Sequence, residues 1–260
     1  MTPLRPLIVT LFVLGAASAT PWLAVPQQGE AAGQASRARE LLSAKRPLTT
    51  TDVEVIRAAV RSALAGRYAV QRVVSLPDMG DSPTVRRQDE YLLDDQARIR
   101  FHRYLVADNA HPGVMRATIR EFTDLPAVRC HDGKPLPGRR LGITYTESWK
   151  GWHIGNPMAV DVNGMPWAMG SPGYDLLHTD AGSVRDLGER SSEGQSTRGF
   201  NLSTPPKDVS IWIDVHSLLP VVERIVLAME GKRLEVSSFW TYPPPRPITP
   251  PPGVKRPDCL

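Results

Sequence analysis

The sequence predicts a mainly β protein of the α+β class, in which an antiparallel sheet follows amino-terminal helices. A capped amphipathic helix precedes Gly66, and after it the hydrophobic period changes from 3.6 residues to two. The last third of the chain holds three long apolar runs joined by short turns, which indicate an antiparallel meander. Because long meanders twist and curl, we expect a strongly curved sheet.

Composition places the chain among globular proteins. Of its 260 residues, 41% are hydrophobic and 22% are charged, which makes intrinsic disorder improbable. The 25 prolines are unusual, and eight of them fall within 243–257. The 20 glycines follow no triplet period, so collagen is excluded. No linker divides the chain, and we expect one domain over 35–242 followed by an extended proline-rich tail over 243–260.

The amino end has the layout of a secretory signal peptide over residues 1–19. A single cation, Arg5, precedes the apolar run Leu7–Leu14, and Ala17–Ala19 forms a small-residue cleavage site. The run is too short for a permanent membrane anchor, and no cysteine follows it to carry a lipid. We expect cleavage near Ala19, a flexible lead over 20–34, and a periplasmic or secreted protein. The alternative is a buried helix of a cytosolic domain.

Two helices are expected before the sheet. Small residues over 35–45 allow a first helix, which Pro47 ends. Thr51 to Glu54 reads as a capping box, and Gly66 closes the helix that follows.

Alternation of apolar and polar residues predicts the strands. It runs over 97–102 and 115–120, with a hairpin turn at 93–96 after a strand at 88–92. The carboxyl-terminal strands are expected at 209–215, 221–229 and 233–240. The segment 125–174 is rich in glycine and proline, and we expect loops there with one or two short strands.

One stretch of the chain resembles a known family. A strand, a turn and a strand that contains a tryptophan follow one another in Val184–Arg190, Phe200–Leu202 and Ile211–Asp214, and Leu219–Val221 comes next. This order resembles the LolA/LppX-type carriers, a family that includes RseB-like sensor domains. The resemblance is clear over 183–254 and loose over 51–122. It implies an incomplete β-barrel with the helices on its concave side, around an apolar cavity that holds acyl chains and performs no chemistry.

The expected lining of such a cavity consists of apolar residues on one face of each strand, with one helix as a lid. Its members are Val53, Ile56, Val60, Ile99, Phe101, Met115, Ile119, Ile211, Ile213, Ile225 and Leu227. Periodicity does not distinguish a hollow interior from a filled core, so both interpretations stay open.

Cys130 and Cys259 are the two cysteines, and an exported chain meets an oxidising compartment. We therefore expect a disulfide between them, which would tie the proline-rich tail to the body of the domain. The alternative is a pair of free buried thiols.

Patterns for catalysis and for cofactors are weak. The six histidines lack the spacing of a metal motif, and Asp161–Gly164 starts like a calcium loop without its later glutamate. No cofactor or metal is therefore expected. The net charge is +4, but the basic residues are interleaved with acidic ones and no aromatic platform accompanies them. This pattern argues against a nucleic-acid partner, whereas peripheral contact with a membrane is compatible with it.

The expected function is non-enzymatic binding of a lipid, a lipoprotein acyl chain or a similar apolar ligand. The alternative is an envelope protein-interaction or sensing module with a filled core and another envelope protein as its partner. A third hypothesis, an exported hydrolase that uses the irregular middle segment, ranks last.

Overall fold

A computed structural model describes most of the folded region. Its described residues are 28–75, 86–107, 111, 113–124, 127–128, 136–137, 140–148, 150–155, 158–160, 171–192, 194–204, 207–229 and 232–254. The expected signal peptide, Cys130 and Cys259 lie outside these ranges, so the cleavage site and the disulfide stay predictions. Within the described ranges, no helix combines the length and apolarity needed to cross a membrane.

Within the described ranges, three α-helices and one 3-10 helix accompany the sheet. They are α1 (Gln28–Leu42), α2 (Thr50–Leu64), α3 (Tyr174–His178) and η1 (Ala181–Ser183). The capping box of α2 starts two residues before the expected one: the Thr49 hydroxyl accepts from the Asp52 amide, and the Asp52 carboxylate accepts from the Thr49 amide. Asp52 also binds Arg46, whose hydrogen bonds hold the pKa of Asp52 well below its usual range.

In the part of the chain that the structure describes, twelve strands form one antiparallel sheet and two short strands form a separate pair. The first half contains β1 (Tyr68–Ser75), β2 (Arg86–Leu93), β3 (Ile99–Ala107), β4 (Met115–Asp124), β7 (Arg140–Ser148), β8 (Gly151–Ile154) and β9 (Met158–Val160). The second half contains β10 (Val184–Ser192), β11 (Gln195–Thr204), β12 (Lys207–Asp214), β13 (Pro220–Met229) and β14 (Lys232–Thr241). The separate pair is β5 (Ala127–Val128) and β6 (Leu136–Pro137).

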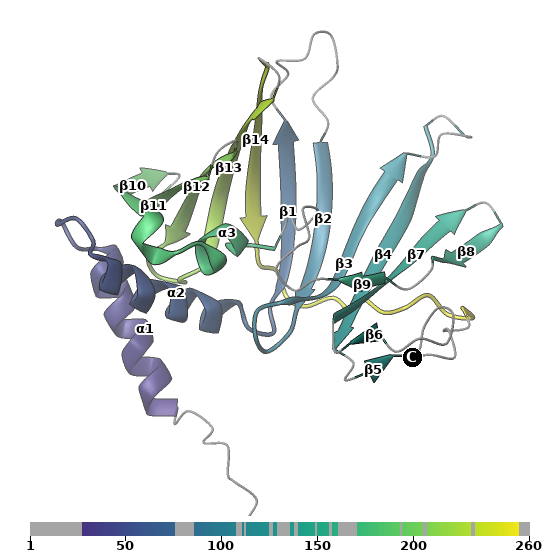
Figure 1. The fold of residues 1–260 in the computed structure, drawn as a ribbon, viewed down its shortest axis with the longest axis horizontal. Helices are drawn as coiled ribbons and strands as arrows, with labels where there is room; N and C mark the ends of the chain where they lie inside the picture. Colours follow the sequence, from purple (N-terminus) through teal and green to yellow (C-terminus); the bar gives the residue numbers. More distant parts are fainter. Residues whose placement is uncertain are drawn as a thin grey trace, which may run out of the picture.

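The strand order is β10-β11-β12-β13-β14-β1-β2-β3-β4-β7-β8, with β9 also paired to β7. The first strand of the chain therefore sits in the middle, between the last strand and β2 (Figure 1). The sheet is not closed into a barrel, and helices pack on one face of it. This arrangement confirms the predicted fold class, a curved antiparallel sheet with amino-terminal helices.

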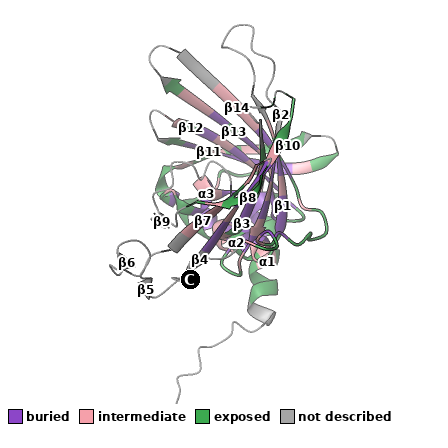
Figure 2. Ribbon diagram, turned by 90° about the vertical axis from the view of Figure 1, so that its right-hand side faces the viewer, coloured by how far each residue is buried: buried purple, intermediate pink, exposed green. Residues whose placement is uncertain are grey.

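Alternation along the strands gives the sheet two faces with separate apolar clusters. The helix face carries Ala69 and Tyr91, which pack with α1, α2 and α3. The opposite face, called the tail face here, carries Tyr68 and Val70 together with Ile248 from the segment after β14. Figure 2 shows the contrast between the largely exposed first turns of α1 and the largely buried middle strands.

Arg198 in β11 fastens the helical layer to the sheet. Its guanidinium makes two hydrogen bonds to the Asp186 carboxylate of β10, at 2.9 and 2.5 Å, and donates to the carbonyls of Ala44 and Arg46 beyond α1. Asp186 also accepts from the Leu48 amide at 3.1 Å. Burial is the largest single influence and raises the pKa of Asp186, but the hydrogen bonds and charge of Arg198, together with the Gly188 and Leu48 amides, leave this pKa below its usual value.

The proline-rich segment after β14 is extended and crosses from the end of β14 toward β7 and β8 (Figure 1). Ile248 is only 4% exposed and belongs to the tail-face cluster, against which Val254 also packs. Five of its residues, 243–247, remain exposed. The tail thus contributes one apolar anchor to the face that the helices leave uncovered.

The middle of the chain is more regular than its glycine and proline content suggested. β7 is a nine-residue strand that pairs with β4, β8 and β9. Ile143 and Tyr145 point to the tail-face cluster, where both are almost fully buried. The expectation of one or two short strands here was wrong, because residues 125–174 contain β5 to β9, and the alternation that indicates β7 is confined to the six residues 141–146.

Candidate ligand-binding cavity

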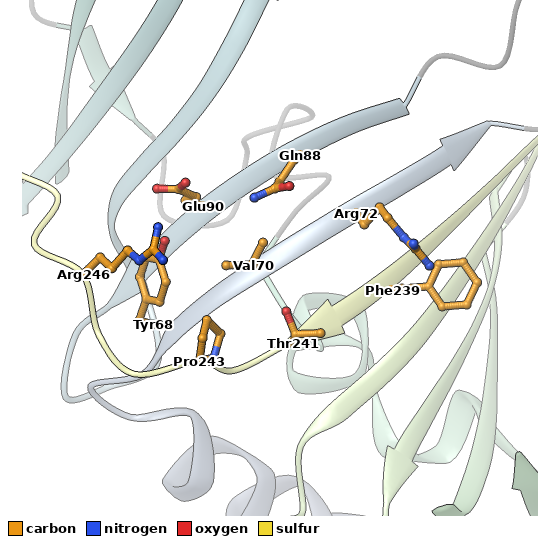
Figure 3. Close-up of a pocket in the computed structure, with 9 residues that line it drawn as sticks. All are labelled: Tyr68, Val70, Arg72, Gln88, Glu90, Phe239, Thr241, Pro243 and Arg246. Atoms are coloured by element: carbon orange, nitrogen blue, oxygen red, sulfur yellow. The ribbon is translucent and has the colours of Figure 1, made fainter. Parts of the chain in front are cut away.

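A cavity of about 470 Å³ opens on the tail face, between β14, β1, β2 and the start of the tail. Its lining combines apolar, uncharged polar and charged side chains (Figure 3). The residues are Tyr68, Val70, Arg72, Gln88, Glu90, Phe239, Thr241, Pro243 and Arg246. A volume in this range suits a small-molecule site.

The register of three neighbouring strands builds the floor of the cavity. Val70 of β1 lies opposite Thr241 of β14 and Glu90 of β2. One step along the same face, Arg72 lies between its own two partners, Phe239 and Gln88. Because paired residues project to the same side of a sheet, these two rows face one space.

Tyr68 forms the deep end of the cavity. Its side chain is almost fully buried and belongs to the apolar cluster that contains Phe101 and Ile143. Burial raises the pKa of Tyr68 to about 12, and the neighbouring Glu90 carboxylate acts in the same direction, while Arg246 acts against it. The phenol therefore stays protonated at physiological pH, with its hydrogen bond directed to the Glu90 carboxylate.

Positive charge exceeds negative charge around the cavity. Glu90, the one carboxylate in the lining, lies 3.7 Å from Arg103 of β3. Arg72 is placed over the Phe239 ring, 5.3 Å from its centroid. Within the described residues neither Arg72 nor Arg246 forms an ion pair, so the cavity can accommodate an anionic group.

The sequence-predicted lining residues separate into three groups. Eight of them belong to or pack against the helix-face cluster: Val53, Ile56, Val60, Ile99, Ile211, Ile213, Ile225 and Leu227. Phe101 and Ile119 are in the tail-face cluster. Met115 is 53% exposed at the start of β4. None of the eleven lines the cavity described above.

A bulge explains why two residues expected on one face pack in different clusters. The register of β2 and β3 shifts so that Leu92 opposes Phe101 whereas Leu93 opposes Ile99. The extra residue, Arg100, interrupts the alternation of β3. Ile99 therefore packs toward the helix face and Phe101 toward the tail face.

The helix face also buries ionisable groups beneath α3. Glu223 is 3% exposed, and burial together with the nearby Asp175 carboxylate raises its pKa to about 8. Asp175 forms an ion pair with Lys207 of β12 at 2.8 Å, and Tyr242 donates to the Pro220 carbonyl. Among the described residues, no three histidine, cysteine or acidic side chains gather as metal ligands.

Few features of the sequence indicate the cavity residues. Arg72 and Val70 belong to β1, where the pattern shows alternation but not which face stays open. Pro243 and Arg246 lie in the tail, whose path across the sheet depends on the distant anchor Ile248. The one available signal was that eight prolines in an extended segment favour packing along a surface over forming a strand.

No family model matches this sequence, and no curated protein matches it. Solved structures with similar folds include a LolA superfamily protein from Nitrosomonas europaea, with a TM-score of 0.31 and 9% identity, covering 75% of this chain and 92% of the other. Another is a DUF1329 family protein from Desulfovibrio piger ATCC 29098, with a TM-score of 0.27 and 9% identity, covering 74% of this chain and 90% of the other. The first carries the family name that the sequence resemblance suggested.

Proposed function

We propose that this protein is an exported, non-enzymatic binding protein for a lipid, a lipoprotein acyl chain or a similar apolar ligand. The observation that supports this most is the open cavity of about 470 Å³ on the tail face. Its Tyr68, Val70 and Pro243 side chains offer apolar contact, and other lining residues add polar and charged groups. Burial of a ligand's apolar surface would supply roughly 25 cal/mol per Å².

The helix face is a less suitable place for the ligand. Ile56 and Leu64 of α2 and Ile211 of β12 are 0% exposed within one cluster, so helix and sheet side chains fill this space with each other. A ligand there would have to displace this packing. We therefore place the ligand on the tail face, and the eleven sequence-predicted lining residues stay a prediction.

The tail gives the proposed carrier a movable wall. Residues 243–247 are exposed and border the cavity, whereas Ile248 is anchored in the apolar cluster. Backbone without sheet hydrogen bonds moves at lower cost than a strand within the ladder. Loading and release would therefore proceed by displacement of this exposed stretch while the sheet remains intact.

A cavity-filling substitution tests the proposed function. Thr241 lines the cavity and is exposed, so Thr241→Trp fills the space with little effect on folding. Delipidated full-length mature protein would be titrated with methyl dodecanoate, a neutral probe, by calorimetry. We expect binding by the natural protein and at least about tenfold weaker binding by Thr241→Trp.

The matched control is Thr146→Trp, because Thr146 is an exposed threonine in β7 that does not line the cavity. It should bind like the natural protein. Equal binding by both variants would contradict this location for the ligand. Native mass spectrometry of protein purified without delipidation would identify a lipid that it already carries.

The packed helix face favours a second candidate, an envelope protein-interaction or sensing module whose core is filled by its own side chains. The two candidates differ in one result. A folded protein that binds neither neutral nor charged apolar probes would support the module and exclude the carrier. Cell fractionation and amino-terminal sequencing test the proposed export, with a mature chain expected to begin near Thr20.

A further inference from the structure

We infer that the ligand of the tail-face cavity is an anionic amphiphile, whose carboxylate or phosphate is bound by Arg72 with the Gln88 amide as a second donor. This inference rests on the proposed function and specifies its ligand class. The two residues are register partners on β1 and β2, and both line the cavity. Figure 3 shows the Arg72 guanidinium turned toward Phe239 and the Gln88 amide turned away from it, so the amide joins the guanidinium on one anion by a rotation of its side chain.

The surroundings of Arg72 leave its charge for a ligand. Within the described part of the chain it forms no ion pair, and the contact found for it is the Phe239 ring, 5.3 Å from the guanidinium carbon. Stacking on an aromatic ring limits the positions of the side chain without using its in-plane donors. Arg72 is therefore held in place with hydrogen-bonding capacity to spare.

The other cavity arginine has a different environment. Arg246 lies at the Tyr68 end of the cavity, near Glu90 (Figure 3). Arg246 and Glu90 act with opposite sign on the Tyr68 hydroxyl, which places both charges close to it. An anion at this end would meet repulsion from the Glu90 carboxylate, whereas Arg72 lies one row further along the strands.

The apolar part of the ligand has a continuous path away from Arg72. Val70 is two residues along β1, and Tyr68 is two residues further on the same face. Tyr68 joins the cluster of Phe101 and Ile143 that Ile248 covers. Val70 and Tyr68 thus offer apolar contact to a chain that leads away from Arg72, while the charges of Glu90 and Arg246 at the far end oppose each other in sign.

The experiment compares probes that share one chain and differ in the head. Full-length mature protein would be titrated with dodecanoate, dodecyl phosphate, methyl dodecanoate and dodecylamine. We expect the two anions to bind roughly tenfold or more tightly than the ester, and the amine to bind more weakly than the ester. A larger advantage for the phosphate than for the carboxylate would indicate a phospholipid as the source, and the reverse a fatty acid.

Substitution of Arg72 should remove the preference without removing binding. In Arg72→Gln, the anions should lose about tenfold or more in affinity and bind about as well as the ester. The matched control is Arg100→Gln, because Arg100 is also an exposed arginine near a phenylalanine ring, 5.6 Å from that of Phe101, but does not line the cavity. It should keep the preference. Added salt should weaken binding of the anions and not of the ester.

The outcomes separate this inference from the proposed function. Ester and anions that bind equally well to the natural protein would overturn the anionic head while the carrier function stands. A preference that Arg246→Gln abolishes and Arg72→Gln retains would overturn the assignment to Arg72. Failure of all four probes to bind would overturn both proposals together.

Discussion

Glu223 shows how one buried carboxyl group can make stability depend on pH. It faces Asp175 of α3, Lys207 of β12 and Tyr242, and the Trp240 indole N–H lies near it without a hydrogen bond of normal geometry. Burial, then the Asp175 charge, raises its pKa to about 8, against 4.5 for an exposed glutamate. The native state therefore holds a proton that the unfolded chain releases between these two values.

The expected consequence is a loss of stability as pH rises. Between about pH 4.5 and about pH 8 the folded protein binds one more proton than the unfolded chain, so the free energy of unfolding falls with increasing pH. Glu223→Gln keeps the shape without the charge and should flatten this dependence. Urea denaturation at several pH values measures it, with the exposed Glu40→Gln as control; an equally steep profile in Glu223→Gln would disprove the assignment.

Thr49 and Thr51 provide a second test at the residue scale. Thr49 caps α2 through its hydroxyl, whereas Thr51 is an exposed residue within the first turn. Thr49→Ala should therefore cost about 1 kcal/mol of unfolding free energy. Thr51→Ala should change the free energy of unfolding by less than about 0.5 kcal/mol. A larger loss for Thr51→Ala than for Thr49→Ala would show that Thr51 caps the helix, as the sequence predicted.

At the scale of elements, Arg198 joins β11, β10 and the carboxyl end of α1. It is 2% exposed, and without it the Asp186 carboxylate would be left in a low-dielectric site with fewer donors. Arg198→Met should cost about 3–5 kcal/mol, and Arg198→Lys should recover only part of this loss because lysine lacks the planar fork. Thermal and urea unfolding provide the measurement.

The double variant Arg198→Met with Asp186→Asn separates the ion pair from simple packing. If the unpaired carboxylate causes the loss, the double variant should be more stable than Arg198→Met alone. If the two losses simply add, the bonds to the Ala44 and Arg46 carbonyls carry the effect instead.

At the scale of the whole molecule, the sheet joins segments from opposite ends of the chain. β1 pairs with β14 over Val70 to Ser75, so about 160 residues separate strands that lie side by side. This pairing creates the cavity, because its walls come from β1, β14 and the tail. The cavity therefore forms only when β14 has paired with β1.

Ile248 should decide whether the tail stays on the sheet. Ile248→Ala removes buried methylene groups from the tail-face cluster and should cost about 2–5 kcal/mol, or detach the tail if detachment costs less. Faster hydrogen exchange and proteolysis after residue 242 would report detachment. Thr249 is the exposed neighbour, and Thr249→Ala should change neither stability nor exchange and proteolysis of the tail. An Ile248→Ala protein with the stability, exchange and proteolysis of the natural protein would exclude the anchor role.

The sequence by itself determined the fold class, because caps, periodicity and turns are local. The helix that ends before Gly66, the hairpin at 93–96 and the strands of the last third all follow from neighbours within a few residues. It misplaced the cap by two residues because three successive threonines offer similar local chemistry. It missed β7 because the six alternating residues 141–146 carry a weak signal beside segments rich in glycine and proline.

Tertiary structure alone decided which side of the sheet remains open. Alternation assigns residues to two faces but does not say which face the helices cover, and the Arg100 bulge reverses that assignment within β3. The eight prolines indicated an extended tail, yet the anchor of Ile248 on distant strands sets its course. The cavity and its arginines depend on such long-range contacts, and local sequence patterns carry no information about them.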